Sequence, residues 1–203
     1  MSEPIITNYR ETRAKTREAL YRRVLDAASR VLVREGYTAL TVRRVADEVG
    51  ASTKVIYTLF ENKDGLVNAL YLQAVQRVRL ALEAVPYHEH SLEYLRILAT
   101  TYRTHVLAHP NDYIILYGLS LPDFKPSESA VQENLASFGI LLMALQRAMD
   151  SGDLAPHDLE SAGKTIISTL NGMLSFEIGG YMDSTEAEGY YAFAVETVLR
   201  GLG

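Results

Sequence analysis

The stretch Gly36–Leu66, GYTALTVRRVADEVGASTKVIYTLFENKDGL, contains the pattern that decides the fold. Apolar residues recur at helical spacing over residues 42–48, directly after Thr41, a good N-cap, so we expect a short helix there. Gly50 interrupts the pattern, and glycine tolerates the positive φ angle that a sharp turn needs. The apolar pattern resumes after this glycine, which predicts two short helices joined by a tight turn, a helix-turn-helix.

The second helix of this unit is expected to run from its cap, Ser52, through Thr58. Its apolar residues Val55, Ile56 and Leu59 share one face, which we expect to point inward. In a helix-turn-helix the second helix protrudes and enters the major groove of DNA. The outward side chains that could reach bases and phosphates are Thr53, Lys54, Tyr57 and Thr58.

The order of residues in this stretch resembles the tetracycline-repressor (TetR) family of bacterial regulators. Members carry an aromatic residue after a helix-ending glycine, a threonine-capped helix, and then a fixed spacing of small, aliphatic, aromatic and basic residues. The positions that match are Gly36, Tyr37, Thr41, Ala46, Asp47, Glu48, Gly50, Ala51, Ser52, Ile56, Tyr57, Phe60, Lys63, Asp64 and Leu66. Lys54 and Leu59 depart from the usual pattern, so the family's base preference cannot be carried over.

The resemblance implies roles for individual residues. Arg43 occupies a position where members often place an arginine that contacts a base, although the neighbouring Arg44 could serve instead, and either could be a solvated helix arginine. Tyr57 and Lys63 are expected to hold phosphates; the plainer alternatives are packing for Tyr57 and solvent for Lys63. The expected DNA-contacting set is Thr41, Arg43, Arg44, Ser52, Thr53, Lys54, Tyr57, Thr58 and Lys63.

The charge distribution favours contact with DNA at one end of the chain. The net charge of the 203 residues is −5, but residues 1–66 hold 12 Lys and Arg against 9 Asp and Glu, which gives +3. The remaining residues hold 8 against 16, or −8. A basic first part and an acidic remainder would orient the protein on a phosphate backbone. Arg10, Arg13, Lys15 and Arg17 could add contacts from an arm or belong to a solvated tail.

The chain has no cysteine, which excludes disulfides and thiolate metal sites. It also has no apolar run long enough for a membrane span and no signal-peptide pattern, so we expect a cytoplasmic protein without a membrane partner.

Helical periodicity along the whole chain predicts an all-α protein of nine helices and no strand. We expect a three-helix DNA-binding domain with its arm at 1–66 and a helical ligand-binding and dimerisation domain at 67–203. Residues 1–14 are polar and expected to be mobile, and the first helix is expected from Lys15 up to Gly36, which ends it. The fourth helix is expected between its cap Asn62 and Pro86.

The later helices are expected at about 91–108, 110–120, 127–150, 157–178 and 185–201. Pro110 suits a first helical turn, and Gly152 suits a helix end. Thr185 and Glu188 have the spacing of a capping box for the last helix.

Polar groups within the apolar helices of the second part indicate a ligand pocket, because a buried amide or hydroxyl needs a partner that a ligand can supply. Asn171, in the run IISTLNGMLSFEIGG, is the clearest example, although an ordinary hydrogen bond between helices would also satisfy it. The residues expected to border one cavity are Tyr102, Tyr117, Phe138, Leu142 and Asn171.

A homodimer is expected because a two-fold DNA operator requires two DNA-binding domains, one from each chain. The apolar residues of the last two helices are the candidate surface, and Gly163, Gly172 and Gly189 would let such helices approach closely; packing within one chain is the alternative. The candidate interface residues are Met173, Phe176, Ile178, Tyr191, Val195, Val198 and Leu199. The resemblance implies a four-helix bundle across the two-fold axis.

The function expected from these patterns is a regulator of transcription, most simply a repressor released from a palindromic operator by a small, largely apolar effector. No catalytic motif is present, and no cofactor is expected. A metal-responsive or activating regulator with the same DNA-binding part is the alternative. His105 with His109, and His88 with His90, are spaced so that they could share a metal, but they fall at expected helix ends, so we assign no metal site.

Overall fold

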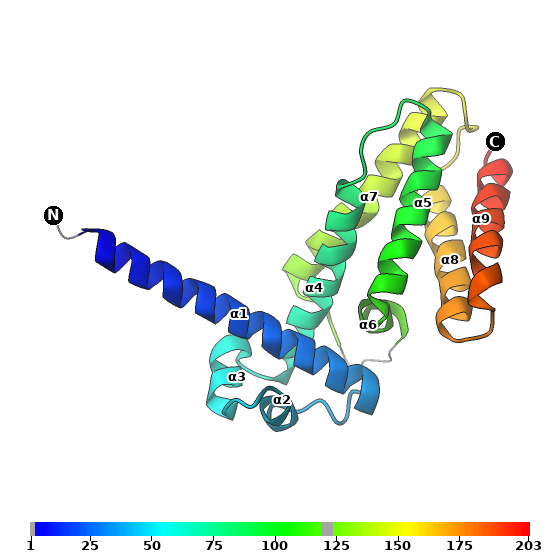
Figure 1. The fold of residues 1–203 in the computed structure, drawn as a ribbon. Coiled ribbons are helices and arrows are strands. Elements are labelled where there is room, and N and C mark those ends of the chain that lie inside the picture. The colour runs from blue at the N-terminus through cyan, green and yellow to red at the C-terminus, as the bar shows by residue number, and fades with distance from the viewer. Residues whose placement is uncertain (1–2, 119–123) are drawn as a thin grey trace. The chain divides into compact units, whose positions relative to one another are not determined.

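The computed structural model describes residues 3–118 and 124–203. These residues form nine α-helices and one π-helical turn, with no strand among them, as the periodicity predicted (Figure 1). Contacts along the chain define two compact units. The first runs to Tyr71 and includes Phe124 and Lys125, and the second comprises Leu72–Gly118 and Pro126–Gly203. The division falls within helix α4 (Lys63–Glu83), where the expected boundary after residue 66 also lies.

The first unit is built from α1 (Glu3–Glu35), α2 (Val42–Val49), α3 (Thr53–Phe60) and the start of α4. α1 packs on α2, and α2 packs on α3. The apolar stripe of α1 is fully buried against them, and the rings of Tyr21 and Phe60 stack with their centroids 4.9 Å apart. The buried apolar residues of this core are Val24, Leu25, Ala27, Ala28, Val31, Leu32, Leu40, Val42, Val45, Ala46, Ile56, Phe60, Leu66, Val67 and Leu70.

The first helix begins earlier than the sequence indicated. Helix α1 starts at Glu3, whereas residues 1–14 were expected to lie outside it. The segment contains strong helix formers, and its one proline lies in the first turn, where it costs no hydrogen bond. Residues 9–19 are all exposed, so this part of α1 is a solvated helix without a core face. Polarity therefore predicted that residues 9–14 are exposed, but it did not predict that their backbone is helical.

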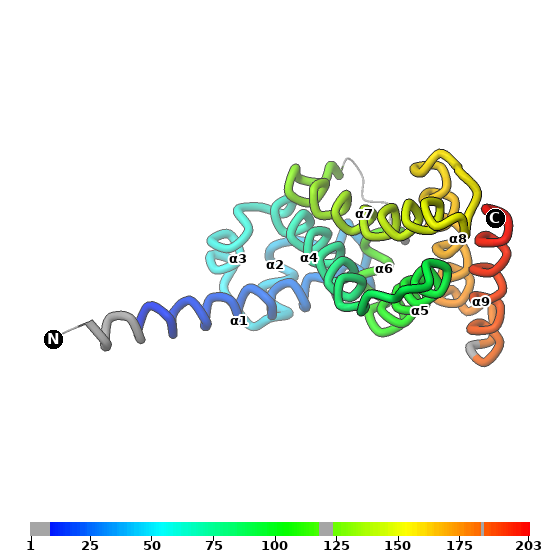
Figure 2. Tube along the Cα trace, turned by 90° about the horizontal axis from the view of Figure 1, so that it is seen from above, coloured from blue at the N-terminus to red at the C-terminus, as the bar shows by residue number. Residues whose placement is uncertain are grey.

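The central helix of the second unit is α5 (Ser91–Ala108). It packs on α7 (Glu128–Asp150), α8 (Leu159–Ile178) and α9 (Ser184–Gly201). α8 lies beside α9, as the ribbon of Figure 1 and the tube of Figure 2 both show. α6 (Pro110–Tyr113) has Pro110 in its first turn, as predicted, and continues as the π turn Ile114–Gly118. The helix expected at 110–120 is thus split in two, and its residues 119 and 120 lie outside the described part of the chain.

Ion pairs reinforce this second unit where its helices meet. Arg103 on α5 donates two hydrogen bonds to Glu177 on α8, at 3.0 and 2.6 Å, and both side chains are largely buried. Arg96 on α5 makes a similar pair with Glu196 on α9, at 2.5 and 3.1 Å. The hydroxyl of Tyr191 on α9 donates to the backbone oxygen of Ala99 at 2.9 Å.

Of the predicted caps, Thr41 and Asn62 make the side-chain hydrogen bond, Ser52 holds the N-cap position without one, and the capping box of the last helix is wrong. The side chain of Thr41 accepts from the backbone N–H of Arg44, and that of Asn62 accepts from Gly65. Ser52 lies at the N-cap of α3, but its side chain makes no capping hydrogen bond. The last helix is capped by Asp183, whose carboxylate accepts from both the N–H and the hydroxyl of Thr185. The expected capping box of Thr185 and Glu188 is therefore wrong, because the carboxylate two residues earlier starts the helix sooner.

None of the helices in the described residues is both long enough and apolar enough to cross a membrane.

Candidate nucleic-acid interface and ligand cavity

The outer face of α3 carries the side chains that the sequence predicted to reach DNA. Thr53, Lys54, Tyr57 and Thr58 are all exposed, while Ile56 and Phe60 are buried on the opposite face. The turn before α3 depends on Gly50, whose φ of 71° lies in the left-handed region that favours glycine. The Thr58 hydroxyl donates to the backbone oxygen of Lys54 at 2.8 Å, so this hydroxyl can still accept a hydrogen bond but has no second proton to donate. Ser52 and Thr41 are exposed next to this face.

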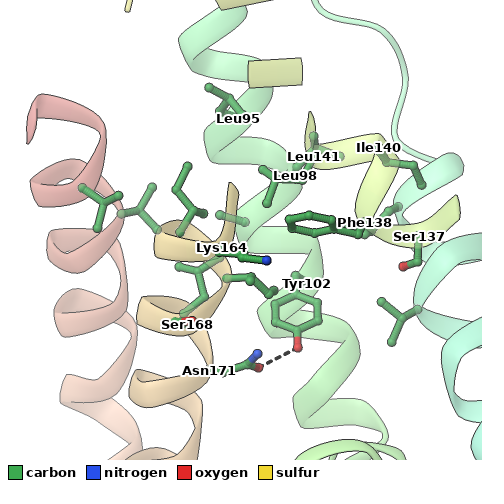
Figure 3. Close-up of a pocket in the computed structure, with 18 of the residues that line it drawn as sticks. Leu95, Leu98, Tyr102, Ser137, Phe138, Ile140, Leu141, Lys164, Ser168 and Asn171 are labelled. Atoms are coloured by element: carbon green, nitrogen blue, oxygen red, sulfur yellow. Dashed lines mark hydrogen bonds between the residues drawn. The ribbon is translucent and has the colours of Figure 1, made fainter. Parts of the chain in front are cut away.

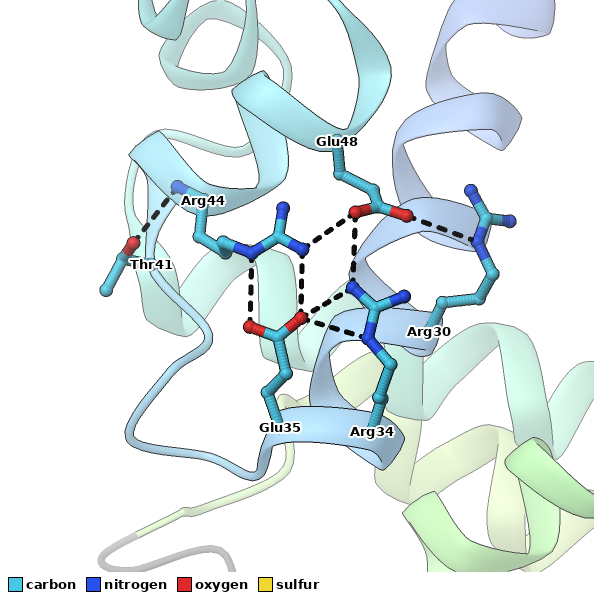
Figure 4. A network of polar contacts seen from close by, with 6 residues as sticks. All are labelled: Arg30, Arg34, Glu35, Thr41, Arg44 and Glu48. Atoms are coloured by element: carbon cyan, nitrogen blue, oxygen red, sulfur yellow. Dashed lines mark hydrogen bonds and ion pairs between the residues drawn. The ribbon is translucent and has the colours of Figure 1, made fainter.

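The two adjacent arginines of α2 have different surroundings. Arg43 is exposed. The guanidinium of Arg44 instead donates to both carboxylate oxygens of Glu35 at 3.1 and 2.9 Å, and to Glu48 at 2.9 Å (Figure 4). Arg34 joins the same two carboxylates, so the end of α1 is tied to α2 through alternating charges. These bonds fix the orientation of the Arg44 guanidinium, so Arg43 is the more accessible of the two arginines predicted to read a base.

This network changes the acidity of its members. Hydrogen bonds from Arg44 and then from Arg34 lower the pKa of Glu35 from 4.5 to about 2. The same two arginines lower the pKa of Glu48. Both carboxylates are therefore charged at neutral pH, and they offset the positive charge of two arginines beside the predicted DNA-reading face.

Lys63 opens α4 and has an internal partner. Its ammonium donates to the backbone oxygen of Tyr37 at 2.8 Å and lies 3.7 Å from the centroid of the Tyr37 ring. The side chain thus holds the loop between α1 and α2 against the start of α4. An ammonium carries three donors, so this contact leaves others for a phosphate.

The junction between α3 and α4 contains two positions that sequence reasoning missed. Glu61 has a φ of 63°, and Asn62 N–H donates to the oxygen of Phe60 across it at 2.7 Å, which is a strained three-residue turn. A Cβ on Gly65 would stand 2.1 Å from the Phe60 oxygen, so only glycine fits at this point of the first turn of α4. The close approach depends on the tertiary path of the chain, and no local pattern marked it.

The second unit has a partly open cavity of about 600 Å³ between α4, α5, the π turn, α7, α8 and α9 (Figure 3). Four of the five residues predicted to border one cavity do so: Tyr102, Tyr117, Phe138 and Asn171. Most of the wall is aliphatic. Its residues are Val75, Val78, Leu82, Leu95, Leu98, Ala99, Tyr102, Leu116, Tyr117, Asn134, Ser137, Phe138, Ile140, Leu141, Lys164, Ile166, Ile167, Ser168, Leu170, Asn171, Val195, Val198 and Leu199.

Leu142 is not among the lining residues, so its placement on the cavity wall was wrong. It packs over Gly163 on α8 instead, where an added Cβ would stand 2.6 Å from its Cδ2 and 2.9 Å from Phe138. Gly163 therefore permits the close packing of α7 on α8 within one chain. One step along α7, Leu141 takes the position on the wall, because a shift of one residue rotates a side chain by about 100° around the helix.

One side of the cavity holds a cluster of neutral polar groups. The Tyr102 hydroxyl donates to Oδ1 of Asn171 at 2.7 Å, and the Tyr113 hydroxyl donates to the backbone oxygen of Asn171 at 2.9 Å. Burial raises the pKa of Tyr102 far above its usual range, and the neighbouring Tyr117, which also hydrogen-bonds to it, raises it further. These hydroxyls therefore stay protonated at physiological pH.

The residues predicted for a dimer surface divide between the interior and the outside. Tyr191, Val195 and Leu199 are buried in their own chain's core, and Val198 lines the cavity. Met173 and Ile178 are partly buried against the same core, and only Phe176 is well exposed. The prediction that α9 presents this apolar set outward was wrong, because the stripe packs onto α5 and α8. The exposed aromatic side chains of α9 are Tyr190 and Phe193.

The histidines considered as a metal pair are close together. The rings of His105 and His109 lie 4.7 Å apart between centroids, and burial lowers the pKa of His105, with the neighbouring His109 lowering it further. Among the described residues no group of three or more His, Cys, Asp and Glu could hold a metal ion.

Comparison with known proteins gives both units the same assignment. The family described as bacterial regulatory proteins, tetR family, matches residues 24–70. The family described as tetracyclin repressor-like, C-terminal domain, matches residues 95–198, which is more than half of the chain. YvkB, an uncharacterized HTH-type transcriptional regulator of Bacillus subtilis, is 44% identical over 52 residues, which are 26% of this chain and 28% of that protein. The match thus spans less than a third of that relative's length.

Solved structures resemble most of the chain. A protein from Rhodococcus superposes with a TM-score of 0.76 at 26% identity, over 90% of this chain and 95% of that one. PfmR, a TetR-family transcriptional regulator from Thermus thermophilus, superposes with a TM-score of 0.71 at 23% identity, over 89% and 98%. The first matched family is described as bacterial regulatory proteins, and YvkB and PfmR are described as transcriptional regulators, not as enzymes. The chain belongs to the tetR family of bacterial transcriptional regulators.

Proposed function

We propose that the protein is a repressor that a small, largely apolar molecule releases from a two-fold DNA operator. The observation that carries the effector part is the cavity of about 600 Å³, which lies within the size range of small-molecule sites and has mainly aliphatic walls. The observation that supports operator reading is the outward face of α3, where four side chains able to contact bases or phosphates lie together.

The protein acts as a homodimer in this proposal, and exposed residues of α8 and α9 form the interface. Phe176 on α8 is 51% exposed, and Tyr190 and Phe193 on α9 are 49% and 71% exposed. A Cβ added at Gly172 or Gly189 would meet nothing within 4 Å, so neither glycine is required by packing inside the chain. Small residues beside exposed aromatic ones suit the close approach of a second pair of helices.

The release mechanism depends on contacts at the polar side of the cavity. Tyr117, which lines it, belongs to the π turn that continues α6, and Tyr113 of α6 is hydrogen-bonded to Asn171. Asp112 of α6 is buried and paired with Arg77 of α4, with both carboxylate oxygens 3.2 Å from Nη1. A ligand that displaces Tyr117 would therefore move α6 against α4 and change the spacing of the two reading units. Release requires the ligand to bind the released state more tightly.

The test uses an operator selected from a pool of random double-stranded DNA, and it measures binding by fluorescence anisotropy. A ligand that fills the cavity should weaken operator binding by about tenfold or more, which corresponds to a coupling of about 1.4 kcal/mol. The substitution Ile167→Trp, which places a large ring in the cavity, should leave DNA binding intact and abolish the response. An unchanged response in I167W would refute the cavity as the effector site.

A further inference from the structure

Around Asn171 the cavity wall carries the neutral polar groups of Tyr102 and Tyr117, and further neutral polar groups belong to Asn134, Ser137 and Ser168. In Figure 3 the Asn171 amide oxygen faces the Tyr102 hydroxyl, and its nitrogen points toward the other lining side chains. Among the described residues, nothing accepts a hydrogen bond from this Nδ2 group, which carries two protons. An acceptor on a bound molecule would satisfy it.

The direction of the hydrogen bonds determines what Asn171 can recognise. The Tyr102 hydroxyl has a single proton, and it goes to Oδ1 of Asn171. Tyr113 occupies the backbone oxygen of the same residue. The amide oxygen is thus held by a buried tyrosine, and the amide nitrogen is left as the donor toward the cavity.

Charges on the rest of the wall favour a neutral ligand. Of the described residues that line the cavity, none is Asp, Glu, Arg or His, so a cationic ligand would find no counter-ion. Lys164 is the one cation, and it is paired with Glu160 at 2.6 Å, with both side chains 66% exposed. A carboxylate beside Asn171 would lose its hydration without gaining a cation.

We propose that the cavity selects an apolar molecule bearing a neutral carbonyl-type acceptor, such as an ester, lactone, ketone or amide oxygen, which accepts from Nδ2 of Asn171. This inference rests on the proposed function only in using the same cavity. Asn171 is the residue that determines specificity, and Tyr102 is a positioning residue that fixes the orientation of the amide.

The test compares four probes of similar length by titration calorimetry on the full chain without DNA: methyl decanoate, decanoate, decylamine and dodecane. Methyl decanoate should bind about 3- to 10-fold more tightly than dodecane, because one hydrogen bond is gained. It should bind at least about tenfold more tightly than decanoate or decylamine, since those ligands carry a charge into the cavity.

The discriminating variant is Asn171→Asp, which keeps the shape of the side chain and the acceptor for Tyr102 but replaces the amide donor by a carboxylate. It should bind methyl decanoate about tenfold more weakly and decylamine more tightly than the unchanged protein does. Asn111→Asp on α6 makes the same chemical change at a residue that does not line the cavity, and it should preserve the preference for the ester.

Three outcomes would overturn the inference: equal binding of ester and alkane, preferred binding of decanoate that Lys164→Gln abolishes, or no binding of any probe. An ester that binds through Asn171 but leaves operator affinity unchanged would support the inference and refute the proposed release mechanism. The calorimetric and DNA measurements therefore separate the two ideas.

Discussion

At the scale of single residues, neighbouring charged side chains in and beside the helix-turn-helix of α2 and α3 have different surroundings. Arg43 and Arg44 are adjacent in sequence, yet only Arg44 is tied to carboxylates on α1 and α2. Lys63 donates to the Tyr37 carbonyl oxygen and is also predicted to hold a phosphate. Such side chains contribute to affinity and to the geometry of the unit, and experiments must separate the two effects.

Replacement of Lys63 by alanine separates them. If the ammonium holds a phosphate, binding to operator and to random DNA should weaken about equally, and the slope of log affinity against log salt concentration should fall by about one. Loss of the 2.8 Å bond to Tyr37 should also lower the melting temperature. A lower melting temperature with an unchanged salt slope would show that Lys63 only braces the loop.

The charge network of Glu35 predicts a dependence of stability on pH. The folded-state pKa of Glu35 is lowered from 4.5 to about 2, so its contribution is fully present above about pH 4.5 and is lost as pH falls toward 2. Glu35→Gln should therefore lower the melting temperature near neutral pH, and the difference from the unchanged protein should shrink below pH 4.5. A difference that stays constant down to pH 2 would contradict the assignment.

At the scale of helices, α5 is the centre of the second unit, because it packs on α7, α8 and α9. Its contact with α8 includes a buried ion pair, in which Arg103 and Glu177 are only 14% and 8% exposed. A buried pair contributes little over a well-packed apolar pair, but breaking it leaves one charge without a partner.

Arg103→Met should consequently destabilise the second unit by about 3 to 5 kcal/mol, since the Glu177 carboxylate remains buried without its partner. Urea unfolding followed by circular dichroism would measure this loss. Lys164→Met removes a cation from an exposed pair with Glu160 on the same α8 helix, and it should cost less than about 1 kcal/mol. Similar losses in the two variants would mean that the Arg103 pair is solvated in solution.

At the scale of the whole molecule, operator recognition depends on how two copies assemble. The exposed aromatic residues on α8 and α9 suggest the interface, whereas Val198 and its buried neighbours hold the chain's own fold and line the cavity. Substitutions that test dimerisation must therefore avoid the buried stripe.

Phe176→Glu combined with Phe193→Glu should produce monomers that remain folded and lose operator affinity, because a charged face opposes its own copy across a two-fold axis. Sedimentation velocity would report the size, and circular dichroism would report the helix content. Met143→Glu changes another exposed apolar residue, on α7, and should leave the dimer intact. Dimers that persist in the double variant would place the interface elsewhere.

The sequence by itself determined the all-helical class, most helix limits and the helix-turn-helix. These features depend on local signals, such as the Thr41 and Asn62 caps, Gly50 and the apolar periodicity, which act within a few residues. Four of the five residues predicted to border one cavity do line it. The prediction worked because polar groups within apolar helices tend to line such sites.

Only the tertiary structure decided which partner each helix face meets. Periodicity shows that Tyr191, Val195 and Leu199 share a face of α9, but the same stripe suits the chain's own core or a second copy, and here it packs inside. Tertiary structure also decided that Arg44 pairs with Glu35. It likewise decided that only glycine fits at position 65, beside the Phe60 oxygen. Each of these features depends on the distance between separate segments of the folded chain. The spacing of residues along one helix gives no information about that distance.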